Sequence, residues 1–123
     1  MILGLPHETK EQMLQTIDYI GCVGIDGIKI QLLHVLKNTD LASYYLNKKF
    51  YIMNMHEYID LLVECIERLP PNIVIHRITG DGPKSILIEP KWSGNKRLVL
   101  NTIKQEFQLR QVIQGKSFKK QLY

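Results

Sequence analysis

Residues 1–9 read Met1-Ile-Leu-Gly-Leu-Pro-His-Glu-Thr9, and this stretch decides the fold. The run Met1–Leu5 is apolar, which is typical of a buried parallel strand. Gly4 and Pro6 make a sharp exit from it, and Thr9 opens a helix. A buried parallel strand normally pairs with a strand on each side. Since this one stands at the very start of the sequence, we expect at least one of its neighbours to be missing.

The rest of the chain alternates between helical and strand patterns. Thr9 and Gln12 match a capping box, and Pro70 ends a later helix because proline cannot continue the hydrogen-bond ladder. The predicted helices cover about 10–23, 41–46, 55–69 and 95–110, and the predicted strands cover 1–5, 28–33 and 73–78. Residues 86–88 are apolar but too few to assign.

Three strands separated by helices predict an α/β fold with parallel pairing and right-handed crossovers. A sheet of three parallel strands has two raw edges, so we expect it to associate with itself or with a missing N-terminal half. Residues 116–123 form a basic tail that should be loose unless it docks.

The net charge of +4 is unevenly spread along the 123 residues. Residues 1–89 hold 8 Lys/Arg and 11 Asp/Glu, whereas residues 90–123 hold 8 Lys/Arg and one Glu. The basic third suits nucleic acid or an acidic protein, although we favour a solvated helix face. No apolar run is long enough to span a bilayer and no signal peptide is recognisable, so we expect a cytoplasmic protein.

The two cysteines are predicted to be buried structural thiols. Cys22 and Cys65 lie in predicted helices, far apart in sequence, which fits neither a disulfide framework nor a metal knuckle. The four histidines also lack the close spacings of a metal site, so no metal is expected in this chain. Nucleotide-binding glycine loops and the common hydrolase and protease motifs are absent from the sequence.

Candidate site residues follow the three strands, because parallel sheets carry their reactive groups beyond the strand ends. After the first strand comes Gly4–Thr9, which also suits a plain turn. After the second comes His34, either a base or a structural residue. The third strand carries His76 and Arg77, which should point to opposite faces. Asp81 follows, to pair with Arg77 or with a substrate cation.

Four segments, in order, resemble YhcC/YtqA-type radical S-adenosylmethionine (SAM) proteins, often described as predicted Fe–S oxidoreductases. Residues 4–9 are similar to the Gly-Leu-Pro-Gly-Glu-Thr signature of the family, and the other segments are residues 24–37, 69–83 and 92–103. The chain is thus identified as the C-terminal part of such a protein, over residues 1–115. The resemblance implies a partial (β/α) barrel.

The resemblance also implies site roles. Three residues, Gly4, Leu5 and Pro6, would lie near the adenine of SAM, and Leu32 and Leu33 would contact it. The substrate side would carry four residues: His34, His76, Arg77 and Asp81.

Two features of the sequence depart from the family pattern. His7 replaces a glycine, and the Cys-x-x-x-Cys-x-x-Cys motif for the [4Fe–4S] cluster is absent. SAM and the cluster are therefore expected in the intact protein, whereas this chain alone should bind neither and be inactive. The alternatives are a non-catalytic module whose basic third binds RNA or protein, and a purely structural piece.

Overall fold

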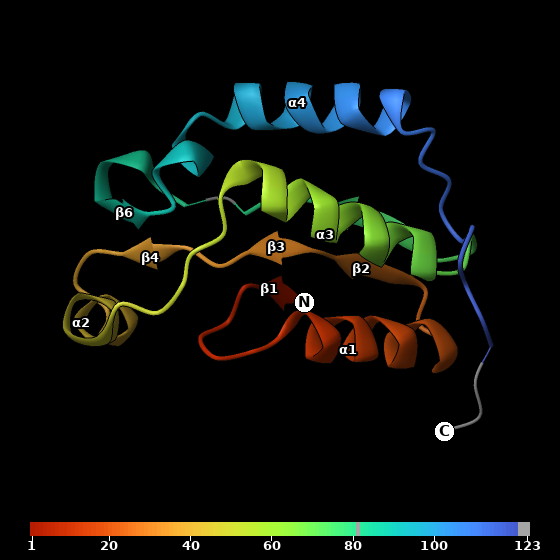
Figure 1. The fold of residues 1–123 in the computed structure, drawn as a ribbon, viewed down its shortest axis with the longest axis horizontal. Coiled ribbons are helices and arrows are strands. Elements are labelled where there is room, and N and C mark those ends of the chain that lie inside the picture. Colours follow the sequence, from red (N-terminus) through yellow and green to blue (C-terminus); the bar gives the residue numbers. More distant parts are fainter. Residues whose placement is uncertain (81, 121–123) are drawn as a thin grey trace.

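The computed structural model describes residues 1–80 and 82–120, which form a mixed α/β fold (Figure 1). The α-helices are α1 (Lys10–Cys22), α2 (Asp40–Lys48), α3 (Met55–Arg68) and α4 (Lys96–Leu109). The strands are β1 (Ile2–Leu3), β2 (Gly27–Lys29), β3 (Gln31–Leu32), β4 (Val35–Leu36), β5 (Val74–Arg77) and β6 (Leu87–Glu89). Two 3-10 helices cover Lys84–Ile86 and Lys91–Gly94.

The chain from β2 to β3 is the central strand of the parallel part. β2 pairs with β5 and β3 pairs with β1, both in parallel. At the residue between them, the N–H of Ile30 donates to the carbonyl of Arg77 at 2.8 Å. The predicted α/β class and parallel pairing are thus confirmed, although the pairs are shorter than expected. The partial barrel implied by the resemblance stays a prediction.

An antiparallel pair was not predicted. β4 and β6 pair in antiparallel orientation beyond the end of β3. β4 lies within a stretch expected to be a loop, and β6 overlaps the unassigned residues 86–88. The three parallel strands predicted from the sequence were therefore incomplete, because the chain turns back after the parallel part and forms this further pair.

The helices pack on one face of the parallel strands. Figure 1 shows α3 between α1 and α4, in front of the strands, and both neighbours contact α3. The main core joins the three helices to alternate strand residues, among them Ile28 and Ile30, which bury their side chains. The intervening residue Lys29 is exposed, as are Ile2 and Val74 of the neighbouring strands. The opposite face of the sheet is therefore open along this part.

The C-terminal segment docks on α3, which is the condition under which the basic tail was not expected to be loose. The N–H of Gly115 donates to the carbonyl of Ile66, and the N–H of Ser117 donates to the carbonyl of Glu67. Both acceptors lie in the last turns of α3. Residues 121–123 lie outside the described part of the chain.

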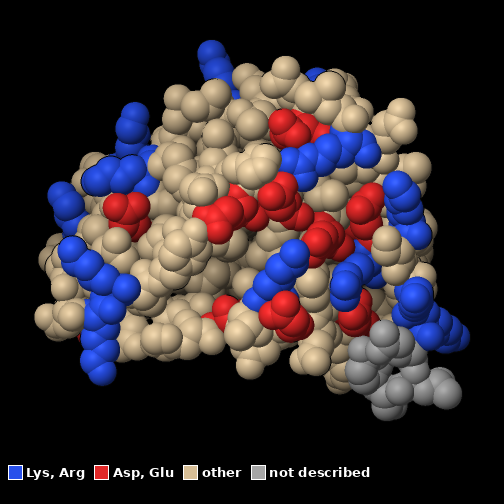
Figure 2. Space-filling view, viewed as in Figure 1, with Lys and Arg blue, Asp and Glu red and all other residues tan. Residues whose placement is uncertain are grey.

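Acidic side chains gather on the helical face, with Lys and Arg among them (Figure 2). α3 contributes Asp60 and Glu64; Arg110 lies 2.6 Å from Asp60, and Lys10 lies 3.1 Å from Glu64. Arg110 also contacts Glu106 at 2.9 Å, so this member of the basic third is neutralised locally.

None of the helices in the described ranges is long and apolar enough to cross a membrane.

Candidate functional site

Three loops meet at the C-terminal edge of the parallel strands, where α/β proteins hold their ligands. They follow β1, β3 and β5, as the sequence predicted. The N-terminal turns of α1 and α3 lie beside them. Each of these helices begins with a capping box, Thr9 with Gln12 and Asn54 with Glu57. The caps fix where each loop ends.

Gly4 is the tightest point of the first loop. Its φ is +93°, a left-handed conformation that favours glycine. A Cβ at Gly4 would lie 3.1 Å from Met53 Cε and 3.9 Å from Leu33 Cβ. The absence of a side chain thus lets the loops after β1 and β3 approach each other and the segment before α3.

His7 adopts a φ of 64°, in the region that favours glycine. The Gly-Leu-Pro-Gly-Glu-Thr signature has glycine at this position, and the positive φ explains that choice. The imidazole Nε2 of His7 lies 2.6 Å from the hydroxyl of Tyr44 in α2, and this contact stabilises the strained turn.

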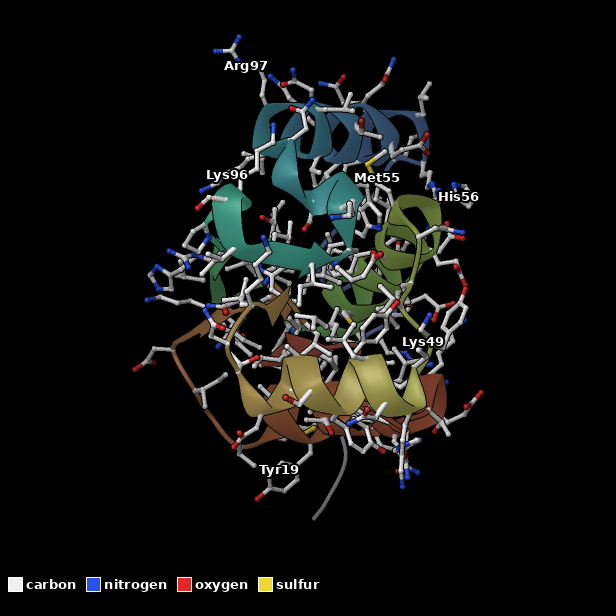
Figure 3. The ribbon with its side chains drawn as sticks, turned by 90° about the vertical axis from the view of Figure 1, so that its left-hand side faces the viewer. Tyr19, Lys49, Met55, His56, Lys96 and Arg97 are labelled. Carbon is white, nitrogen blue, oxygen red and sulfur yellow. The ribbon has the colours of Figure 1, made fainter. Side chains whose placement is uncertain are left out.

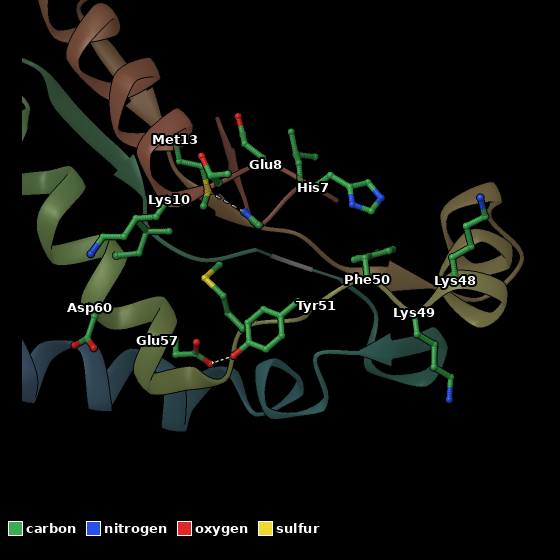
Figure 4. A pocket seen from close by; sticks show the side chains of 15 residues that line it. His7, Glu8, Lys10, Met13, Lys48, Lys49, Phe50, Tyr51, Glu57 and Asp60 are labelled. Atoms are coloured by element: carbon green, nitrogen blue, oxygen red, sulfur yellow. Dashed lines mark hydrogen bonds between the residues drawn. The ribbon is translucent and has the colours of Figure 1, made fainter.

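A pocket of about 710 Å³ opens beside this loop (Figure 4). Its size is in the range of small-molecule sites. Its apolar wall includes Leu5, which is 42% exposed. Further apolar lining residues are Met13, Phe50, Met53 and Leu61, and the charged ones are Glu8, Lys10, Lys48, Lys49, Glu57 and Asp60. The pocket therefore offers an apolar surface with charged groups around it.

Three of the six charged groups at the pocket have partners among the described residues, namely Lys10, Glu57 and Asp60. Tyr51 donates a hydrogen bond to the carboxylate of Glu57, and this bond raises the pKa of Tyr51. The same carboxylate oxygen accepts from the backbone N–H of Asn54 at 3.1 Å. A helix cap and a pocket wall are thus built from one carboxylate.

The loops after β3 and β5 also touch. A Cβ at Gly80 would lie 2.5 Å from the ring of His34, and one at Gly82 would lie 2.8 Å from it. The half-buried imidazole therefore packs against the turn after β5, and a side chain at either glycine would displace the ring. Asp81, which stands between them in sequence, lies outside the described residues.

His76 and Arg77 do not alternate, and the prediction of opposite faces was wrong. β5 shifts register there: Ile75 pairs with Ile28, and Arg77 pairs with Lys29. His76 is the extra residue of a β-bulge, which re-aims side chains. Ile75 and Ile78 both pack against the core, whereas the two residues between them are exposed.

The ring of His76 lies over Gly27, since a Cβ there would be 2.6 Å from its Nε2. Gly27 starts β2, so the structure does not bring His76 to His34, which follows β3.

The remaining predicted residues differ in exposure. Pro6 is half-buried within the loop after β1. Leu32 is buried in the main core and Leu33 in a second core with Val35, Ala42 and Phe50. Their contact with adenine stays a prediction. The described residues contain no group of three or more His, Cys, Asp or Glu that could hold a metal.

Sequence reasoning missed the segment between α2 and α3. Phe50, Tyr51 and Met53 line the pocket from this segment, together with Met13 of α1. No local pattern marks them, because tertiary contacts bring them to the loop after β1. The one signal was the cap formed by Asn54 and Glu57, which places the start of α3 beside them.

Residues 25–108 match the radical SAM C-terminal domain family. The chain belongs to this family. It is 39% identical to YtqA of Bacillus subtilis over 98% of its own length and 37% of that protein. It is 30% identical to MJ0486 of Methanocaldococcus jannaschii, over 96% and 37%, and to YhcC of Escherichia coli, over 78% and 31%. The chain thus spans about a third of these relatives.

The fold also has a solved counterpart. Elp3 of the archaeon Methanocaldococcus infernus, with residues 1–46 deleted, superposes with a TM-score of 0.73. The match covers 92% of this chain and 26% of that one at 16% identity, so the likeness concerns the fold alone. The resemblance of this sequence to radical SAM proteins is therefore confirmed by the family match and the relatives, and the fold agrees with it.

Proposed function

We propose that this chain forms the C-terminal wall of a radical SAM enzyme. The wall is the parallel part of the sheet with its helices, and the open face looks into the interior of a barrel completed by further strands. In such barrels the helices lie outside and the reactive groups lie at the C-terminal edge. The exposed Ile2 and Val74 on the open face support this arrangement, because both leave apolar surface uncovered.

The adenosyl group of SAM is proposed to lie against Gly4, Leu5 and Pro6. When bound, SAM and a [4Fe–4S] cluster would supply a 5′-deoxyadenosyl radical by reductive cleavage. The residues present fit the nucleoside end: Leu5 offers apolar surface beside a pocket of about 710 Å³. They offer no thiolate set for the cluster, since Cys65 is buried in α3 and Cys22 lies at the end of α1. The cluster ligands are proposed to lie outside residues 1–123.

The observation that carries this proposal is the geometry at Gly4. A positive φ and a 3.1 Å approach to Met53 make this glycine necessary for the shape of the loop. By resemblance, the substrate-side residues are proposed to be His34, His76, Arg77 and Asp81. The cofactor would do the chemistry, while these residues bind and orient.

A chimera tests the proposal. This chain would replace the matching third of YtqA, and 5′-deoxyadenosine would be measured after anaerobic cluster reconstitution, SAM addition and reduction. We expect release from the chimera and a loss of at least about tenfold in Gly4→Ala, because small displacements at a reactive site cost large factors. Gly94→Ala is the matched control, since a Cβ there meets only side chains at 3.4 Å or more. A chimera that holds a cluster and SAM but releases no 5′-deoxyadenosine contradicts the proposal.

A further inference from the structure

We propose that Lys29, His76 and Arg77 form an oxyanion site on the open face of the sheet, which binds a carboxylate or phosphate group of the substrate. This assignment rests on the proposed function, because that function makes the open face the interior of the enzyme. It adds the chemical class of the substrate and gives a role to Lys29, which was not among the candidate site residues.

The β-bulge brings the three side chains together. Lys29 of β2 and Arg77 of β5 are directly paired across parallel strands, where paired residues point to the same side. Lys29 points away from the core, because Ile28 and Ile30 on either side of it are buried. The extra residue His76 adds its imidazole on the same face, over Gly27.

The three groups are not used by the fold. Within residues 1–80 and 82–120, no ion pair or side-chain hydrogen bond joins Lys29, His76 or Arg77 to another residue. The cations of the helical face behave differently: Lys10, Arg68 and Arg110 each contact a carboxylate within 3.1 Å. The open face therefore keeps its positive charge available.

Enclosure in a barrel would make this unpaired positive charge energetically costly. Directly paired like charges repel, and removal of water from an unpaired cation is costly, so an enclosed Lys29–Arg77 pair requires a counter-anion. The guanidinium of arginine matches carboxylate and phosphate oxygens in a bidentate manner, and a lysine ammonium adds a second charged donor. The imidazole supplies an N–H donor in either protonation state. These groups together fit a planar or tetrahedral oxyanion.

The chain itself, without SAM, is suited to the test. Backbone amide shifts would be followed by NMR during titration with inorganic phosphate and with acetate, each at constant ionic strength set with sodium chloride. We expect saturable shifts at residues 27–31 and 74–78. The tighter of the two probes would identify the group as phosphate or carboxylate.

Variants make the result specific. Lys29→Gln and Arg77→Gln should each weaken binding at least about fivefold, the loss expected for one charge-assisted contact. Arg77→Lys should bind more weakly than the parent chain and more tightly than Arg77→Gln, because the charge is kept and the bidentate geometry is lost. Lys104→Gln is the matched control, since Lys104 is an exposed lysine on α4, away from the pocket and the open face.

Non-saturable shifts, or equal weakening in Lys104→Gln, would overturn the assignment. So would unchanged binding in both Lys29→Gln and Arg77→Gln. Failure of the YtqA chimera to release 5′-deoxyadenosine would count against the proposed function and would leave this titration readable, because the titration needs neither SAM nor a cluster.

Discussion

The hydroxyl of Tyr58 in α3 donates a 2.6 Å hydrogen bond to the carbonyl oxygen of Ile78, just beyond β5. The side chain of Tyr58 is fully buried, and burial raises its pKa. The ring also packs at 5.9 Å from Trp92, whose Nε1 donates to the carbonyl of Met53 at 3.0 Å. One tyrosine thus connects the end of β5 to the segment that lines the pocket.

Tyr58→Phe should lower the free energy of unfolding by about 1–2 kcal/mol, because it leaves the partly buried carbonyl of Ile78 without its donor. Urea denaturation with unchanged m-value would measure the loss. Tyr45→Phe is the control: Tyr45 packs against Phe50 at 5.3 Å between ring centroids, without a hydroxyl partner in the described structure. An equal loss in both variants would show that the bond to Ile78 contributes nothing.

The thiol of Cys65 should make the protein sensitive to alkali. Burial raises its pKa from 9.0 to about 12, so the folded state keeps a proton that the unfolded state releases. The free energy of unfolding should therefore be fully retained below pH 9.0 and fall as the pH rises toward about 12, by up to about 1.4 kcal/mol per pH unit. Denaturation midpoints measured at pH values from 8 to 10 would show this slope before Tyr58 contributes.

The variant Cys65→Ala should flatten that slope while lowering stability at neutral pH, because the small cavity it leaves is apolar. Cys22→Ala serves as control and should keep the slope of the parent chain, since Cys22 is only half-buried at the end of α1. A slope that survives in Cys65→Ala would assign the alkaline loss to another group.

Lys49 ends α2 in a left-handed conformation, with φ 38° and its N–H donating to Tyr45 at 2.7 Å. Lys49→Gly should raise the free energy of unfolding by about 1 kcal/mol, since glycine takes this conformation without strain. Lys48→Gly, one residue earlier and inside the helix, should lower it by about 0.5–1 kcal/mol. Figure 3 places Lys49 on the side of the molecule that carries α2 and β6. Thermal melts would compare the two glycines; a gain in neither would contradict the strain at Lys49.

The helix starts could be read from the sequence because each is encoded locally. Thr9 with Gln12, and Asn54 with Glu57, form the caps that their spacing predicts. The antiparallel β4–β6 pair could not be read, because two residues such as Val35 and Leu36 carry no periodicity.

The candidate site was predictable only where it follows strand ends. Gly4 and Leu5 were found in this way, and both line the pocket. Met53 was missed because its contact with Gly4 spans two elements. The joint exposure of His76 and Arg77 was missed because strand alternation assumes a regular register, and the bulge breaks it.

Gln114 holds the C-terminal segment against the start of β5. Its Nε2 donates to the carbonyls of Pro70 at 2.9 Å and Ile73 at 2.7 Å, and the Pro70 carbonyl also accepts from the N–H of Ile73 at 3.2 Å. Gln114→Ala should therefore lower the free energy of unfolding by about 1–2 kcal/mol. It should also loosen the neighbouring Gly115 and Ser117, whose amides bond to the last turns of α3.

Amide hydrogen exchange would separate these two effects. In the parent chain the Ser117 amide should be protected, and in Gln114→Ala its exchange should accelerate more than that of buried α3 amides, because the segment opens locally before the core does. Gln108→Ala is the control: Gln108 is exposed on α4 and should leave the exchange of Ser117 unchanged. Rapid exchange of Ser117 in the parent chain would instead mean that residues 116–120 behave as the loose tail their composition predicts.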